Sequence, residues 1–447
     1  MAKSIRHIHN EVADPHYRDG QLEWYGARLN DIADRQGTPL HLGSSEAAAD
    51  SFRAFMQPFK RYGLPLQVYY SVKTHPLPAY LKKIHSMGSG FETVSGWEYR
   101  LLKKVGVEDE HIIHTGDPLN HPEELRLTVV ATRGQVDRLI SRLKSESEKP
   151  VSAGITINPH LRRGLWDITL NTGTRRSPLG FHPSSDEFME VVQQISGTRG
   201  VELMGLHMHL GSAIHSHKPF IKGIDTLART ARLLKKHGIT VTMLDIGGGF
   251  SLPNAPMMKV RNMIPSLFGM AGKNGSLKDT SGYLDVIAKH LAKTIDGLKS
   301  EGIFITTLAA EPGRILSGPT QLSLFTIKDI VEKNGSHYLL CDAGAMSISP
   351  MLLTERHRVL PLIKRDNPQR TYTVMGKLPS ALDRISNAVE MPEVRRGDRI
   401  AVLDTGAYVI SMNNTFNGPR PPIAWTENGI LRIVRQKETE QGLYWDK

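Results

Sequence analysis

The chain lacks the features that mark membrane, disulfide-rich and cysteine-metal proteins. Cys341 is the only cysteine among 447 residues, so an intrachain disulfide and a multi-cysteine metal site are both excluded. No apolar run reaches the roughly 18 residues that a membrane-spanning helix needs, and the N-terminus has no apolar signal segment. We therefore expect a cytoplasmic protein that does not insert into a membrane.

A concentrated basic surface is missing as well. The formal charge is +11, from 56 Lys and Arg residues against 45 Asp and Glu residues, but the basic residues are scattered along the chain. A nucleic-acid-binding protein would gather them, together with aromatic residues, into one stripe. Because a cofactor phosphate and an anionic small molecule also attract positive charge, the composition favours a small anionic ligand over nucleic acid.

A regular alternation of short apolar runs and helical segments extends from about residue 37 to residue 325. The apolar runs include Leu66–Val72, Gly90–Val94, His111–Thr115, Ser152–Ile157, Glu202–Leu210, Thr240–Ile246 and Ile303–Ala310. About eight such repeats are the number found in a (β/α)8 barrel with a parallel sheet. We therefore predict an α/β fold with a TIM-like barrel over residues 37–325.

The pattern changes at about residue 326. The segments that are predicted to be short strands are Tyr338–Cys341, Arg370–Val374, Arg399–Val402 and Ile430–Arg435. Turns that contain Pro and Gly separate them in place of long helices, which is typical of an all-β domain. We predict this domain over residues 326–447 and expect the N-terminal segment 1–36, with a helix around Leu22–Arg35, to pack on it.

Lys73 directly follows one of the predicted barrel strands, Leu66–Val72. Burying an unpaired ammonium group costs several kcal/mol or lowers its pKa by up to about 3–5 units. A lysine with a lowered pKa is a good amine nucleophile and can form a Schiff base with a carbonyl cofactor. The alternative is a lysine that ends a strand and simply reaches solvent.

Two later barrel strands end in residues that can hold a ligand. His207 and His209 close one of them; such a pair can bind a metal, stack on a planar ring or form hydrogen bonds inside the barrel. Gly247–Gly249 close the next strand, where unhindered N–H groups can form a nest for a phosphate, although an ordinary turn explains a glycine triplet equally well. The C-terminal ends of parallel barrel strands share one face, which is where active sites form.

A third strand is followed by Glu311, Gly313 and Arg314. A buried glutamate needs a cationic partner, such as a protonated ring nitrogen, and Gly313 and Arg314 offer an N–H group and a guanidinium to a phosphate. A Glu–Arg salt bridge on a loop is the alternative. Tyr408, in the predicted all-β domain, adds either a phenol for the same ligand or a core tyrosine.

Together these residues form one set, ordered along one barrel. A lysine for a Schiff base, His209 for ring stacking, a glycine nest, Glu311 for a pyridine nitrogen and Arg314 for a phosphate are what pyridoxal 5′-phosphate requires. None of the single alternatives explains all five features. Because no HExxH pattern and no carboxylate cluster accompany the two histidines, we predict no metal site.

The ordered motifs resemble those of the fold-type-III, alanine-racemase-like decarboxylases that act on diaminopimelate, ornithine and arginine. The resemblance extends from about Leu40 to Tyr408. The motifs that carry it are Tyr70–Lys73, Gly90–Ser95, His209–Ser212, Gly247–Phe250, Glu311–Arg314 and Gly406–Tyr408.

The resemblance implies a cofactor and the residues that contact it. Lys73 would bind pyridoxal phosphate as a Schiff base, His209 would stack on its ring, and Glu311 would contact its pyridine nitrogen. Glu92 takes the place of an aspartate that this family usually has near the cofactor. The residues implied around the phosphate are Ser212, Gly248, Gly249, Gly313, Arg314 and Tyr408. Since the family's active site forms between subunits, a homodimer with a shared site is expected.

Two departures from the family pattern concern the substrate. The family's β domain carries a Cys-Glu-X-X-Asp segment, whose cysteine protonates the decarboxylated carbon from across the dimer. Here Pro379 or Ser380 replaces that cysteine, and Asp383 retains the aspartate. The Arg-Pro-X-Leu-Tyr segment that holds the distal carboxylate of diaminopimelate is replaced by Ser349–Leu353. The residues expected to contact the substrate instead are Lys377, Ser380, Asp383 and Arg384.

The resemblance therefore predicts a decarboxylase for an anionic amino acid or amino-acid conjugate other than meso-diaminopimelate. A citrylated diamino acid of siderophore biosynthesis, such as N-citrylornithine, is the leading expectation. A decarboxylase of free diaminopimelate, ornithine or lysine is one alternative, and an amino acid racemase of the same fold is another. An inactive regulatory homologue is the non-enzyme alternative, and retention of Lys73 argues against it.

Overall fold

The chain forms two compact units in the computed structural model. The model describes residues 14–117, 127–146, 151–161, 172–252, 282–348, 357–380, 383–416 and 418–439. The barrel unit comprises the described parts of 55–251 and 280–315, and the sheet unit comprises those of 1–54, 252–279 and 316–447. Among the described residues, no helix has both the length and the apolar character needed to span a membrane.

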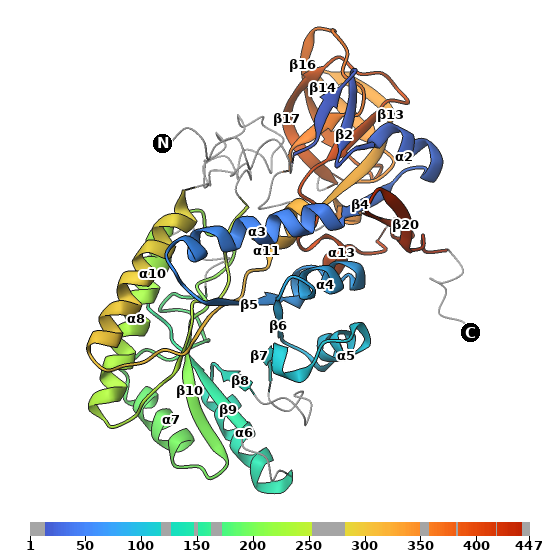
Figure 1. Cartoon of the computed structure of the whole chain (residues 1–447). Helices are drawn as coiled ribbons and strands as arrows, with labels where there is room; N and C mark the ends of the chain where they lie inside the picture. Colours follow the sequence, from blue (N-terminus) through green and yellow to red (C-terminus); the bar gives the residue numbers. More distant parts are fainter. Residues whose placement is uncertain are drawn as a thin grey trace. The chain divides into compact units, whose positions relative to one another are not determined.

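Parallel strands close the barrel unit in the order in which they occur along the chain. They are β5 (Leu66–Ser71), β6 (Gly90–Thr93), β7 (Ile112–His114), β8 (Leu127–Val130), β9 (Val151–Thr156), β10 (Val201–His207), β11 (Met243–Asp245) and β12 (Thr307–Ala310). Each pairs with the next, and β12 closes the ring by pairing Leu308 with Leu66 of β5. The predicted eight-stranded barrel is therefore confirmed (Figure 1).

Helices follow the barrel strands and cover their outer side (Figure 1). They are α4 (Pro78–His85), α5 (Gly96–Val105), α6 (Arg133–Glu146), α7 (Asp186–Ser196), α8 (His217–Lys236) and α10 (Tyr283–Ser300). Local signals set their ends: in α5 the Ser95 side chain accepts a hydrogen bond from Glu98 N, and Gly106 ends the helix in the left-handed conformation. In α8, Phe220, Ile224, Leu227 and Leu234 are buried at helical spacing.

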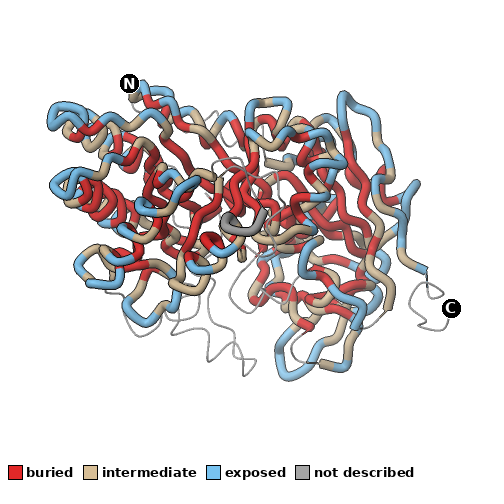
Figure 2. Tube along the Cα trace, turned by 90° about the horizontal axis from the view of Figure 1, so that it is seen from below, coloured by how far each residue is buried: buried red, intermediate tan, exposed pale blue. Residues whose placement is uncertain are grey.

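The sheet unit is built mainly from strands, which confirms the predicted all-β part of the fold. Its larger sheet has the strand order β17-β16-β14-β13-β4-β19-β20, with β18 joining β13 to β15. These strands are β4 (Leu40–Ser44), β13 (Gln321–Lys333), β14 (Ser336–Cys341), β15 (Val359–Pro361), β16 (Gln369–Met375), β17 (Arg384–Pro392), β18 (Arg399–Val402), β19 (Ile423–Glu427) and β20 (Ile430–Arg435). Buried residues follow the strands of each unit (Figure 2).

In the N-terminal part of the sheet unit, a strand occupies the beginning of the segment that was predicted to be a helix. Residues Gln21–Trp24 form strand β2, which pairs with β1 (His16–Arg18) and β3 (Ala27–Arg28), and helix α2 spans only Leu29–Gln36. Tight turns explain the difference, because Asp19, Gly20, Tyr25 and Gly26 all have positive φ angles. The expectation of a helix from Leu22 was therefore wrong over its first turns.

Strand β4 belongs to the sheet unit although it lies within the range predicted for the barrel. It pairs with β13 through Leu42 and Leu322 and with β19 through Leu42 and Ala424. The boundaries 37–325 and 326–447, and the packing of segment 1–36, stay predictions about domain organisation.

Candidate active site

Lys73 lies in the one-turn helix η1 (Val72–Thr74) that follows β5, and it is held by a buried carboxylate. Its Nζ donates to both oxygens of Glu92, at 2.9 Å to Oε1 and 2.8 Å to Oε2. Glu92 is on β6 and is 1% exposed. Lys73 is therefore oriented by Glu92 at the C-terminal end of the barrel. It does not simply extend into solvent.

Two hydroxyl groups complete the surroundings of Glu92. Ser71 Oγ donates to Oε2 at 2.5 Å, and Thr115 Oγ1 donates to Oε1. Burial alone would raise the pKa of Glu92, but the Lys73 ammonium and these donors lower it to about 2. Glu92 is consequently a carboxylate at neutral pH. The sequence reasoning did not identify Ser71 and Thr115, although each lies at the C-terminal end of a barrel strand.

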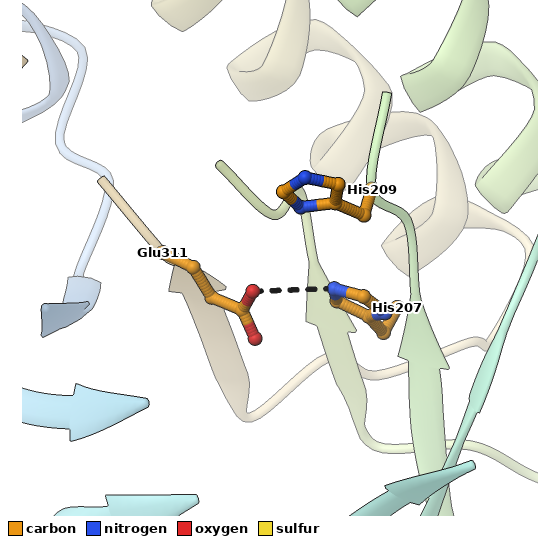
Figure 3. Close-up of side chains that lie close together, drawn as sticks. All are labelled: His207, His209 and Glu311. Carbon is orange, nitrogen blue, oxygen red and sulfur yellow. Dashed lines mark ion pairs between the residues drawn. The ribbon is translucent and has the colours of Figure 1, made fainter. Parts of the chain in front are cut away.

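His207, His209 and Glu311 form the second cluster (Figure 3). His207 ends β10, His209 comes two residues later, and Glu311 follows β12; both rings lie on the side of the Glu311 carboxylate. One ligand atom from each residue lies within 4.8 Å of the others, and His207 Nε2 is 3.4 Å from Glu311 Oε2. The ring centroids are 6.5 Å apart at an interplanar angle of 27°. This spacing suits a metal ion or one edge of a planar cofactor.

Burial controls the charge of this cluster. It lowers the pKa of His209 to about 3, helped by the positive charge of Lys73, and it also lowers the pKa of His207. Burial, with the negative charge of Glu92, raises the pKa of Glu311 well above its ordinary value. Both imidazoles are therefore neutral at neutral pH. A cationic partner would stabilise the ionised form of Glu311, which its burial disfavours.

Glycines bring the backbone close together beside this cluster. A Cβ atom on Gly248 would lie 2.5 Å from the Glu311 carbonyl oxygen, and one on Gly313 would lie 2.3 Å from Thr74 Oγ1. Gly249 has a φ angle of 92°, and its carbonyl accepts from Ile214 N at 2.9 Å. Only glycine fits these positions, so the loops after β10, β11 and β12 form one cradle.

Arg314 brings a positive charge to this cradle. Its Nη2 donates to Ser212 Oγ at 3.3 Å, which links the loop after β12 to the loop after β10. The predicted phosphate residues Ser212, Gly248, Gly249, Gly313 and Arg314 are thus brought together. Backbone N–H groups and a guanidinium are the donors that bind phosphate.

The residues present fit pyridoxal phosphate. Glu311 Oε1 is buried and receives no amide, amine or hydroxyl donor from the described part of the chain, so it is available to a protonated ring nitrogen. His209 offers a neutral ring, Lys73 an amine, and the glycine cradle a place for the phosphate.

Comparison with protein families agrees with this fit. The model of the pyridoxal-dependent decarboxylase pyridoxal-binding domain matches residues 48–318, and that of the C-terminal sheet domain matches residues 319–406. The chain belongs to the pyridoxal-dependent decarboxylases. It is an enzyme that uses pyridoxal phosphate to decarboxylate an amino acid, as the motifs predicted.

Known relatives of this decarboxylase match it over nearly its whole length. Diaminopimelate decarboxylase of Aquifex aeolicus is 25% identical over 431 residues, which cover 94% of both chains. The diaminopimelate decarboxylase of Archaeoglobus fulgidus is 27% identical over 431 residues, covering 94% of this chain and 95% of the relative.

Solved structures share the fold of the decarboxylase. Diaminopimelate decarboxylase from Methanocaldococcus jannaschii in complex with L-lysine has a TM-score of 0.84 and 22% identity, with 97% of each chain covered. The lysine/ornithine decarboxylase of Vibrio vulnificus complexed with putrescine has a TM-score of 0.70 and 16% identity, covering 90% of this chain and 98% of the other.

The remaining predicted site residues of the decarboxylase lie in the sheet unit. Tyr408 precedes helix α13 (Val409–Met412) with a φ angle of 60°. Asp383 is 1% exposed, and its carboxylate accepts from Ala345 N at 2.7 Å and from Leu378 N at 2.9 Å. Asp383 therefore fixes the backbone of two loops. The cofactor contact of Tyr408 and the substrate contacts of Lys377, Ser380, Asp383 and Arg384 stay predictions.

A cavity of about 100 Å³ lies beside Asp383 within the sheet unit. Its lining residues are Pro39, Asp342, Ala343, Gly344, Met346, Ser347, Lys377, Leu378, Asp383, Asn414, Gly418, Pro419 and Lys437. Asp342 already accepts hydrogen bonds from Thr38 Oγ1 at 2.6 Å and from Thr326 N at 3.0 Å. The segment Ser349–Leu353, which replaces the family's arginine and tyrosine, lies outside the described residues.

Proposed function

We propose that this decarboxylase removes the α-carboxylate of an amino acid, or of an amino-acid conjugate, that has an anionic distal part and is not meso-diaminopimelate. The observation that carries its chemistry is the fixed Lys73–Glu92 pair in one barrel unit with the His209–Glu311 cluster. When bound, pyridoxal phosphate supplies an electron-accepting ring that stabilises the negative charge left by CO₂. The family assignment favours this reaction over racemisation.

Lys73 is the residue proposed to bind the cofactor, and Glu92 is proposed to orient it. Because the pKa of Glu92 is lowered to about 2, its carboxylate is a weak base and a poor acceptor for the lysine proton. Its two hydrogen bonds instead direct Nζ and stabilise its positive charge. The support for His209 as the ring-stacking residue is its neutral, partly exposed imidazole next to His207.

Glu311 and the glycine cradle are proposed to hold the two ends of the cofactor. Glu311 would pair with the protonated ring nitrogen, which would supply the cation that its buried carboxyl group lacks. Gly248, Gly249 and Gly313, with Ser212 and Arg314, would hold the phosphate. We propose that Tyr408 adds its phenol to the phosphate contacts.

The acid that returns a proton to the product carbon is not a cysteine in this proposal. Cys341 is fully buried in the hydrophobic core of the sheet unit, and burial raises the pKa of its thiol. Lys73 is the acid that we propose, because Glu92 holds its proton at a defined atom, Nζ. The replacement of the family's cysteine by Pro379 or Ser380 is then explained by a change of proton donor.

The substrate proposal is supported by two lysines of the sheet unit near the altered segment. Lys377 and Lys437 line the cavity together with Asp342 and Asp383, whose carboxylates accept hydrogen bonds from their own unit. The lining is formally neutral, and its two ammonium groups are the part that an anionic group would contact. A citrylated diamino acid such as N-citrylornithine, used in siderophore biosynthesis, has several carboxylates and is the leading candidate.

Free meso-diaminopimelate is the second candidate, because relatives that match nearly the whole chain are diaminopimelate decarboxylases. Against it stands the replacement of the family's arginine and tyrosine by Ser349–Leu353. We further propose a homodimer with an active site shared between subunits.

The test is an absorbance spectrum of the purified protein with pyridoxal phosphate, followed by CO₂ release from a panel of amino acids. We expect a band of lysine-bound cofactor that disappears in Lys73→Ala, and turnover of a citrylated diamino acid at a rate typical of enzymes, about 1–10³ s⁻¹. Turnover of free diaminopimelate at that rate, with none of the conjugate, would overturn the substrate proposal. Absence of the band would contradict the role of Lys73.

A further inference from the structure

A buried acidic residue next to the histidine–glutamate cluster is not used in the proposed function. Asp245 ends β11, the strand that lies between β10 and β12 in the barrel. It pairs in register with His207 on β10 and with Ala309, two residues before Glu311, on β12. Asp245 is 0% exposed and Glu311 is 4% exposed. Two carboxyl groups are therefore buried side by side at the ends of neighbouring strands.

The surroundings of this pair favour a shared proton. Asp245 Oδ1 accepts from Gly247 N at 2.7 Å. Asp245 Oδ2 and Glu311 Oε1 are buried without an amide, amine or hydroxyl donor among the described residues. Ionised carboxylates only accept hydrogen bonds and repel each other, so two neighbouring buried carboxyl groups are stabilised when one of them is protonated.

We propose that Asp245 and Glu311 hold one proton between them, and that Asp245 is a positioning residue which keeps the pair at a single negative charge for the pyridine nitrogen. The proposal rests on the proposed contact of Glu311 with that nitrogen.

The charges that face the pair agree with a single negative charge on it. Lys73 and Glu92 neutralise each other at 2.8 Å, and burial lowers the pKa values of His207 and His209, so that both rings are neutral. One protonated ring nitrogen then balances one negative charge on the pair. A doubly ionised pair would leave a buried charge without a counterion, which is strongly unfavourable. Burial raises the pKa of Asp245 to about 8 and that of Glu311 well above its ordinary value, so the pair holds at least one proton at neutral pH, and a cationic ring nitrogen favours ionisation of one of the two groups.

His207 lies beside Glu311, on strand β10, which flanks β11 on the side away from β12. Thr156 Oγ1 lies 3.0 Å from His207 Nδ1, and His207 Nε2 lies 3.4 Å from Glu311 Oε2 (Figure 3). When the threonine hydroxyl donates to Nδ1, the neutral ring carries its hydrogen on Nε2 and directs it to Glu311. The neutral ring of His207 thus borders the carboxyl group of Glu311 without adding charge.

The pH dependence of folding tests the shared proton. Above its unfolded pKa of about 3.9 and up to about 8, Asp245 is protonated in the folded protein and ionised in the unfolded one, so its contribution to stability falls as pH rises. Thermal unfolding of the full-length protein is measured from about pH 5.5 to about pH 8.5 for wild type and Asp245→Asn. We expect the stability of the variant relative to wild type to increase with pH. A relative stability that does not change with pH would overturn the proposal.

Substitution of both partners sharpens the test. If one proton is shared, Glu311→Gln alone removes most of the same pH dependence, and the double variant with Asp245→Asn adds little to it. Additive effects of the two substitutions would mean that each group titrates independently, against the proposal. Asp296→Asn is the control, because Asp296 is exposed on the outer helix α10, away from the pair; we expect it to leave the slope unchanged.

Cofactor affinity supplies the second measurement. An asparagine carries an amide donor where the protonated Asp245 carries its hydroxyl, so Asp245→Asn should bind pyridoxal phosphate within about threefold of wild type, and Asp245→Ala at least about tenfold more weakly. Equal losses in both variants would show that Asp245 acts as an anion. Unchanged affinity in Glu311→Gln would instead contradict the proposed role of Glu311, which separates the two failures.

Discussion

The barrel unit retains more of the residues that are usual in the decarboxylase family than the sheet unit does. The barrel unit retains the lysine, the histidine proposed to stack, the glycine cradle and the glutamate, and hydrogen bonds within that unit hold Lys73 and Arg314. In the sheet unit, Asp383 is retained and fixes two loops, but the cysteine, arginine and tyrosine of the family are replaced. We therefore propose that the barrel specifies the cofactor chemistry and the sheet unit specifies the substrate. Substitutions in the barrel should therefore lower kcat, and those in the sheet unit should raise KM.

Replacement of Lys73 has the largest expected effect. Lys73→Ala removes the proposed nucleophile and proton donor, and we expect kcat to fall by at least about 10³-fold, as for other covalent catalysts. Lys73→Arg is the matched control, because it keeps a positive charge next to Glu92 but forms no Schiff base. Both variants should lose the absorbance band of lysine-bound cofactor. Activity in Lys73→Arg within tenfold of wild type would show that only the charge matters.

Glu311→Gln is expected to lower kcat by about 10²–10³-fold, the usual cost of removing one preorganised electrostatic group. The amide keeps the size of the side chain but cannot provide a negative charge for the ring nitrogen. Steady-state kinetics should be measured at saturating pyridoxal phosphate, because a low kcat with the cofactor fully bound identifies an electronic role in addition to the weaker cofactor affinity. An unchanged kcat would contradict the proposal that the barrel unit carries the cofactor chemistry.

Much of the fold and of the cofactor site was predictable from local sequence patterns. Strands β18 and β20 have the predicted bounds, and the barrel strands follow from apolar runs. The sequence placed glycines at positions 248 and 313 in the predicted phosphate site, and the structure leaves no room for a side chain at either position. Motif order carried this information, since the motifs from Tyr70–Lys73 to Glu311–Arg314 lie in chain order at the ends of β5, β6, β10, β11 and β12, and only Gly406–Tyr408 lies in the sheet unit.

Contacts between strands were not predictable in the same way. Ser71 pairs in register with Glu92, and His207 with Asp245, but a local pattern does not report which residues of neighbouring strands face each other. The hydroxyl donors of Glu92 and the Asp245–Glu311 pair were missed for this reason. Similarly, the apolar residues of β4 indicate a strand but not its partners, and it pairs in the sheet unit.

Glu92→Gln tests the electrostatic part of the barrel site. The amide cannot neutralise the Lys73 ammonium, so we expect kcat to fall by about 10–10²-fold. Folded Glu92 has its pKa lowered to about 2, below the unfolded value of about 4.3, so its stabilising contribution is complete above that unfolded value and is lost as pH falls towards 2.

The stability difference between wild type and Glu92→Gln should therefore shrink as pH falls below about 4.3. Thermal unfolding over acidic pH measures it. Glu92→Asp is the control, because it restores the residue usual in the family and keeps the charge; it should lose less activity than Glu92→Gln. A difference in stability that is independent of pH would mean that Glu92 acts through its size alone.

Lys377→Ala in the sheet unit has the smallest expected effect and tests the other half of the comparison. Loss of one ammonium group from the cavity lining should weaken the binding of an anionic substrate by about tenfold, or about 1.4 kcal/mol. KM should therefore rise while kcat stays within about twofold. Lys299→Ala, an exposed lysine in the last turn of α10, is the control for overall charge and should leave both constants unchanged. High salt should reduce the effect, because the cavity charge is exposed to screening. An equal fall in kcat with unchanged KM would place Lys377 in the chemical step and remove the distinction between the two units.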